Sequence, residues 1–157
     1  RLFGAAANAE GWAHYCEQMM LDEGFGQPGV GARDERQSQL LRLGQLQDAL
    51  LRNARYIVGL RMHTGDMSFE QGVQFFVDEG FQSREVGVVE TKRGTQDPTY
   101  LYYTLGKLQL LKLRADLQAR EGAAFSLRAF HDAFMRQGFA PLAIVRRALL
   151  GDDSPTL

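Results

Sequence analysis

The amino-acid sequence predicts an all-α protein, a bundle of about six to seven helices. Apolar residues recur at helical spacing along most of the chain, helix-capping residues stand at the expected boundaries, and no segment alternates as a strand would. The one β-like stretch, Val86 to Val89, is short and lies between helix signals. We expect helices over about residues 3–22, 34–64, 68–79, 83–93, 97–121, 126–137 and 141–150.

The first two helices are predicted from composition and periodicity. Residues 3–22 are rich in Ala, Glu, Gln and Met, and Gly24 ends the run. The segment 24–31 contains four glycines and one proline, which indicates a loop. From Asp34 to Met62, leucines and other apolar residues recur with near-helical spacing, which predicts the longest helix of the chain.

Three further helices are predicted from serine caps. Ser68 is followed three residues later by Gln71, which is the capping-box pattern. Ser83 and Ser126 stand at the starts of two other helical segments, where a serine hydroxyl can accept a hydrogen bond from a free backbone N–H.

The last two starts are marked by proline. Asp97-Pro98 is the strongest start signal in the chain, because aspartate is a good N-cap and proline fits the first helical position. Pro141 begins the final helix. We expect a single helical domain over 1–151 and a disordered tail over 152–157.

Composition excludes several function classes. The 157 residues include 18 Lys+Arg and 19 Asp+Glu, so no net positive field exists to hold nucleic acid or anionic lipid. The longest apolar runs are too short to span a membrane. Cys16 is the single cysteine, which excludes an internal disulfide framework or a Cys-rich zinc cage. The start at Arg1, without an initiator Met, leads us to expect a fragment of a longer protein.

One helical face carries candidate metal ligands. Glu10, His14 and Glu17 stand at positions i, i+4 and i+7, so they share a face. No His-x-x-x-His pair exists, so the chain alone cannot form the usual two-histidine helical zinc site. On spacing alone, a solvated or hydrogen-bonded helix face is the alternative to metal binding.

Two other groups could contact a substrate. Tyr100, Tyr102 and Tyr103 lie close together, and a phenol can donate a hydrogen bond to a developing oxyanion. Arg55 and His63 are eight residues apart and so lie roughly on one helical face. The alternatives are tyrosines that pack with their hydroxyls in water, an exposed arginine, and a histidine that stabilises the helix dipole.

The residues Glu10-Gly11-Trp12-Ala13-His14-Tyr15-Cys16-Glu17 resemble the Glu-Gly-Trp-Ala-x-Tyr-x-Glu motif of a bacterial family called domain of unknown function 885. That family is similar to the zincin metallopeptidases. Further resemblances follow in the family's order: Arg55 to His63 with Glu70-Gln71, Glu90 with Arg93, Asp97 to Lys107, and Phe130-His131-Asp132 with Gly138 and Pro141-Leu142.

The resemblance implies a role in a zinc site. In such proteins a His-Glu pair and a second His on an upstream helix bind zinc, and the glutamate that matches Glu10 completes the site. That upstream segment is absent here, so we expect the C-terminal part of a zinc peptidase, inactive alone. The resemblance also implies that Glu17 orients a histidine ligand, that His63 and Tyr103 stabilise the oxyanion, and that Arg55 and Tyr100 bind substrate.

The implied partners are a peptide substrate and the remainder of the same polypeptide. Apolar helix faces that normally pack against that remainder could also lead to self-association. Exopeptidase and endopeptidase action are both open, and relatives are often exported by bacteria. The competing hypothesis is a non-catalytic helical domain that binds a partner protein. A di-metal oxidase-like bundle would need a second helix of carboxylates, which the sequence does not contain.

Overall fold

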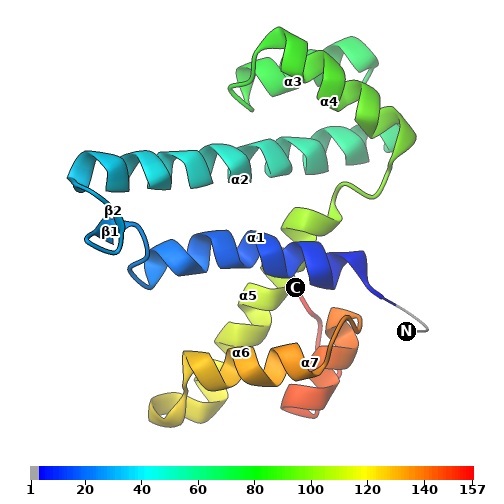
Figure 1. Cartoon of the computed structure of the whole chain (residues 1–157). Coiled ribbons are helices and arrows are strands. Elements are labelled where there is room, and N and C mark those ends of the chain that lie inside the picture. Colours follow the sequence, from blue (N-terminus) through cyan, green and yellow to red (C-terminus); the bar gives the residue numbers. More distant parts are fainter. Residues whose placement is uncertain (1–3) are drawn as a thin grey trace. The chain divides into compact units, whose positions relative to one another are not determined.

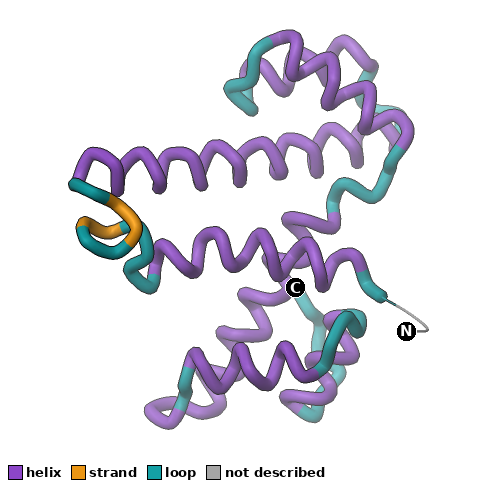
Figure 2. Tube along the Cα trace, in the orientation of Figure 1, coloured by secondary structure: helices purple, strands orange, loops and turns teal. Residues whose placement is uncertain are grey.

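Seven α-helices form nearly all the regular structure of residues 4–157, the part of the chain that the computed structural model describes (Figure 1, Figure 2). They are α1 (Ala6–Asp22), α2 (Glu35–Thr64), α3 (Phe69–Asp78), α4 (Arg84–Gln96), α5 (Tyr102–Glu121), α6 (Leu127–Arg136) and α7 (Leu142–Leu150). A short 3-10 helix, η1 (Gly122–Ala124), follows α5. The predicted all-α bundle is confirmed.

The predicted caps form as the sequence indicates. The Ser83 side chain accepts a hydrogen bond from the backbone N–H of Val86 (3.3 Å) and caps α4. At the start of α3, Ser68 and Gln71 make both hydrogen bonds of the capping box. Ser126 caps α6 through the backbone N–H of Ala129. These helix starts are fixed by side chains within four residues of them, which is why the sequence predicts them well.

One helix start differs from the prediction. Helix α5 begins at Tyr102, and Asp97 is the C-cap residue of α4 instead of the N-cap residue of α5. The Asp97 carboxylate accepts hydrogen bonds from the backbone N–H (2.9 Å) and the hydroxyl of Thr99, which forms a turn over residues 97–99. The start predicted at Phe3 lies outside the described residues.

A minimal pair of strands occurs where the sequence predicts only a loop. Strands β1 (Gln27–Pro28) and β2 (Gly31–Ala32) are parallel and two residues long. Gly26, Gly29 and Gly31 have positive φ in this segment, so the chain folds back on itself within a few residues.

Within the predicted single domain of residues 1–151, the structure has two compact units. The central unit, residues 16–104, holds α2, α3 and α4, which contact one another. Its core is centred on Ala54, Val58 and Phe76, with Val73 also buried. Figure 1 shows α3 and α4 lying along one side of α2.

The terminal unit holds the described residues 4–15 and 105–157, that is, most of α1 and α5 with all of α6 and α7. Its buried side chains include Leu110 and Leu113 of α5, Phe130 and Phe134 of α6, and Val145 of α7. Apolar residues one turn apart on each helix therefore face a shared core.

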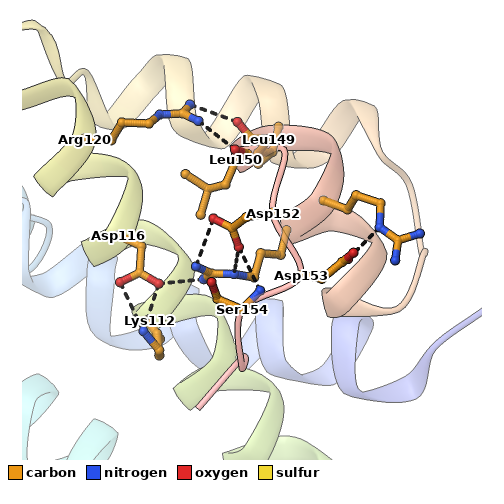
Figure 3. Close-up of polar contacts among 10 residues, drawn as sticks. Lys112, Asp116, Arg120, Leu149, Leu150, Asp152, Asp153 and Ser154 are labelled. Carbon is orange, nitrogen blue, oxygen red and sulfur yellow. Dashed lines mark hydrogen bonds and ion pairs between the residues drawn. The ribbon is translucent and has the colours of Figure 1, made fainter.

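The chain after α7 is attached to the terminal unit by polar contacts (Figure 3). Arg146, buried on α7, donates to Asp116 of α5 (2.6 Å) and to Asp152 of the tail (2.7 Å). Near the end of the chain, the Gln109 side chain donates to the Thr156 hydroxyl (2.8 Å). The tail that the sequence predicts to be disordered thus contacts α5 and α7 in the structure.

Across residues 4–157, no helix is long and apolar enough to cross a membrane.

Candidate functional site

Glu10 lies in the middle of α1, and the side chains around it hold this part of the helix in place. Asn8 donates to two backbone carbonyls near the start of α7, those of Gly138 (3.2 Å) and Ala140 (2.7 Å). The Trp12 ring stacks on Phe134 of α6, with 5.0 Å between centroids and 12° between planes. The backbone that carries Glu10 is therefore fixed on both sides by long-range contacts.

A close helix crossing fixes α1 from a third direction. Gly11 faces Gly106 of α5, and a Cβ built on Gly11 would lie 2.6 Å from the Gly106 Cα. A Cβ on Gly106 would lie 2.9 Å from the Gly11 Cα and would clash with the Ala7 carbonyl. Only glycine at both positions allows the two helix backbones to approach this closely. The residue next to Glu10 is thus the point where α1 packs on α5.

The Glu10 carboxylate itself is half-buried, and within residues 4–157 it makes no hydrogen bond or ion pair. His14, one turn further along α1, is 2% exposed and has other contacts. Glu17 accepts a hydrogen bond from Arg52 of α2 (2.7 Å) in a half-buried ion pair. Of the three residues predicted to share a face, Glu10 is the one with no hydrogen-bond or ion-pair partner among residues 4–157.

The described residues do not form a complete metal site. Residues 4–157 contain no group of three or more His, Cys, Asp or Glu side chains placed to hold one ion. A catalytic zinc ion usually has three protein ligands and one open position. The partly exposed Glu10 carboxylate fits the role of a single oxygen ligand, and the other ligands would have to come from residues beyond this chain.

The predicted substrate-binding residues lie in the central unit. Arg55 of α2 donates from Nε and Nη2 to the Glu90 carboxylate of α4 (2.6 and 2.8 Å). The Arg55 and Glu90 side chains are 17% and 8% exposed, so this is a well-shielded bidentate pair. The hydrogen bond to Glu90 raises the pKa of Arg55. Two of the donor nitrogens predicted to bind substrate are therefore used within the protein.

Tyr100 joins the same cluster. Tyr100 is 5% exposed, and two guanidinium groups lie over its ring, with centroid distances of 5.7 Å to Arg55 and 5.4 Å to Arg93. Burial raises the pKa of the Tyr100 phenol, so its hydroxyl stays protonated at neutral pH. Arg93 also contacts Glu90 (3.5 Å) and keeps half of its side chain exposed. The structure thus brings Arg55 and Tyr100 together around Glu90.

The two residues predicted to stabilise the oxyanion, His63 and Tyr103, lie on different helices. His63, near the end of α2, is exposed, and its Nε2 lies 2.8 Å from the Gly94 carbonyl oxygen. Because a carbonyl only accepts, Nε2 carries a proton and donates it. Tyr103 is half-buried at the start of α5, with its ring 4.8 Å from that of Tyr102. Their roles stay predictions.

Sequence reasoning missed two polar clusters. Glu90, the carboxylate that binds Arg55, is 35 residues away from it in the sequence, and no local pattern pairs them. In the terminal unit, the buried Tyr15 hydroxyl accepts from Arg114 (3.1 Å) and lies 2.8 Å from His131 Nε2. The motif residues Tyr15 and His131 were the available signal, although spacing alone does not relate them.

The comparison with known families agrees with the motif resemblance. Residues 1–149 match the family described as bacterial protein of unknown function, DUF885. The chain belongs to this family. A search of curated proteins found no match.

Two solved structures resemble this DUF885 chain. One is "a putative lipoprotein of unknown function" from Shewanella oneidensis, with 31% identity and a TM-score of 0.82 over 95% of this chain and 26% of the other. The second is a "putative lipoprotein" from Colwellia psychrerythraea, with 29% identity and a TM-score of 0.79 over 92% of this chain and 23% of the other. The chain therefore spans about a quarter of the length of the two solved proteins that it matches.

Proposed function

We propose that this DUF885 chain is the C-terminal helical part of a zinc-dependent peptidase, to which it contributes Glu10 as one metal ligand. The observation that carries the proposal is the Glu10 carboxylate. It is half-buried, and among residues 4–157 it has no hydrogen-bond or ion-pair partner. A carboxylate without a protein partner leaves its oxygens open to a cation.

The packing around Glu10 supports the same proposal. A metal ligand must be held within a fraction of an ångström, and α1 is anchored by Asn8, by the Gly11–Gly106 crossing and by the Trp12–Phe134 stack. The anchors lie two residues before, one residue after and two residues after Glu10. Such local rigidity is not needed for a carboxylate that is only solvated.

The chemistry follows from the ligand set that the family resemblance implies. Two imidazoles and one carboxylate leave a fourth position for water, whose pKa a bound zinc ion lowers towards neutrality. In this chain, Tyr103 would donate a hydrogen bond to the oxyanion. His63 would give a second donor, with its Nε2–H turning from the Gly94 carbonyl to the oxyanion. Arg55 would bind a substrate carboxylate through Nη1, beside the Tyr100 hydroxyl.

The test is the substitution Glu10→Gln in the full-length protein. Glutamine keeps the size and helical preference of the side chain but removes its charge, so we expect zinc content to fall at least tenfold with the helical circular dichroism unchanged. Glu23→Gln, an exposed change just beyond the end of α1, is the matched control and should retain full zinc. Stoichiometric zinc in the Glu10→Gln protein, measured by elemental analysis, would move the ligand role to another residue.

A second candidate function is a non-catalytic helical domain that binds other proteins. Exposed large apolar side chains on α2, among them Leu43, Leu46 and Leu60, favour it. The two functions differ in the full-length protein: the peptidase binds zinc and cleaves peptides, whereas the interaction domain does neither.

We also propose that the full-length protein is exported, because both solved relatives are described as lipoproteins. Cell fractionation of the source bacterium should find it in the envelope fraction, and recovery in the cytoplasm alone would contradict export.

A further inference from the structure

Helix α2 carries a row of large apolar side chains, four of which are at least 40% exposed. The row consists of Leu43, Leu46, Leu50, Ile57 and Leu60, with Asn53 at the intervening position. Leu50 is partly buried, and Asn53 accepts a hydrogen bond from the Thr104 hydroxyl (2.9 Å). Leu43 and Leu46 are 51% and 54% exposed, and Ile57 and Leu60 are 40% and 46% exposed. The steps along the row alternate between three and four residues, which is the spacing of a seam between packed helices. We call this row the apolar seam.

The charges of α2 avoid the apolar seam. Between Leu43 and Leu60, the charged residues are Asp48, Arg52 and Arg55. At about 100° per residue, all three point to the opposite side of the helix from the seam. Arg52 and Arg55 are engaged there in ion pairs with Glu17 and Glu90. A helix face that stays in water would be expected to carry charged residues, and this one carries none.

Phe81 extends the apolar seam beyond α2. It lies between α3 and α4, is 80% exposed, and has φ of 49°, which is unusual for an aromatic residue. Together with Leu43, Leu46 and Leu50, it lines a groove on the surface of the central unit. An aromatic side chain that is both strained and exposed marks a surface that another element covers.

We propose that the apolar seam and Phe81 dock an amphipathic helix from the part of longer DUF885 proteins that lies outside this match. The solved relatives supply the reason, since this chain covers 26% and 23% of them and about three quarters of each chain is left to pack against it. The uncharged seam fits a permanent interface within one polypeptide, because exposed, transient interfaces carry more charge. This inference does not depend on the zinc peptidase proposal.

Thiol labelling tests the docking directly. In a Cys16→Ser background, cysteine is introduced at Leu46, at Phe81 and, as a control away from the seam, at Val89 of α4, which is 56% exposed. All three should react rapidly with a maleimide in the 157-residue chain. In the full-length Shewanella oneidensis relative, freed of its own cysteines, the positions aligned with Leu46 and Phe81 should react at least tenfold more slowly than in the 157-residue chain. The position aligned with Val89 should change much less.

Two results would overturn the proposal. One is equal labelling rates at all three positions in the full-length relative. The other is protection of Leu46 and Phe81 in the 157-residue chain that grows with protein concentration, which would identify a second copy of the chain as the occupant. A glutamate substitution gives an independent measurement. Placed in the full-length relative at the position aligned with Leu46, it should lower the melting temperature by several degrees. Leu46→Glu in the 157-residue chain should leave the melting temperature unchanged.

Discussion

At the residue scale, the central unit depends on a charged pair that joins distant positions of the chain. Arg55 and Glu90 form a bidentate pair between α2 and α4, and the two side chains are 17% and 8% exposed. The sequence relates Arg55 only to residues on its own helix, such as His63, because helical spacing carries no information about other helices. The Glu90 partner follows from tertiary packing, and no local pattern of residues could reveal it.

Glu90→Gln should destabilise the protein by about 3 kcal/mol, because it leaves the shielded Arg55 guanidinium without its counter-charge. The free energy of unfolding from urea titration, followed by circular dichroism, measures the loss. A matched control exists on the neighbouring helices. Glu70 of α3 pairs with Arg84 of α4, and both side chains are more than half exposed.

Glu70→Gln should leave the free energy of unfolding nearly unchanged, since exposed pairs contribute little. If the two substitutions had equal effects, the shielding of the Arg55–Glu90 pair would have no energetic consequence.

At the element scale, the sequence predicts helices far better than it predicts their contacts. The predicted caps at Ser68, Ser83 and Ser126 are local, and all three form. The predicted start at Asp97-Pro98 is wrong because Asp97 binds the Thr99 backbone and hydroxyl in a turn instead of capping the next helix. In the candidate site, the ordered motifs identify Glu10, but they do not show that its neighbour Gly11 is the point where α1 crosses α5.

The crossing of α1 and α5 gives a second prediction. Gly106→Ala should destabilise the protein by about 2 kcal/mol or more, because the added methyl group would force the Gly11–Gly106 backbones apart. Thermal unfolding measures the effect. Gly44→Ala on α2 is the matched control, since nothing lies within 4 Å of the added Cβ, and it should stabilise the helix by about 0.5–1 kcal/mol. A tolerated Gly106→Ala would mean that the crossing can relax.

The attachment of the tail to α5 gives a prediction about pH. Hydrogen bonds from Lys112 and Arg146 hold the pKa of Asp116 below its ordinary value. A lowered folded-state pKa means that this stabilisation is complete above the ordinary aspartate pKa and is lost as pH falls through the lower, folded value. The contact of Arg146 on α7 with Asp116 on α5 should therefore persist at neutral pH and weaken only in acid.

Carboxyl ¹³C shifts recorded against pH should show Asp116 titrating below an unfolded aspartate. Arg146→Met should move that midpoint upwards, while Arg147→Met, which removes an exposed pair with Asp153, should leave it unchanged. An unchanged Asp116 midpoint in Arg146→Met would show that Lys112 alone lowers the pKa.

At the scale of the whole molecule, two independent features indicate that other residues complete this chain. The Glu10 carboxylate has no protein partner within residues 4–157, and the apolar seam on α2 is exposed. Glu10 belongs to the terminal unit and the apolar seam to the central unit. Both agree with a chain that spans about a quarter of its solved relatives.

The last prediction compares the chain alone with the full-length protein. The 157-residue chain should bind zinc weakly, because residues 4–157 contain no group of three ligands and a lone carboxylate competes poorly with water for the ion. Zinc added in stoichiometric amount should therefore be lost on gel filtration from the isolated chain and retained by the full-length protein. Retention by both would place a complete metal site within this chain. Loss of zinc from both proteins would contradict the zinc-dependent function. The docking of a helix on the apolar seam is tested separately, by the thiol-labelling experiment.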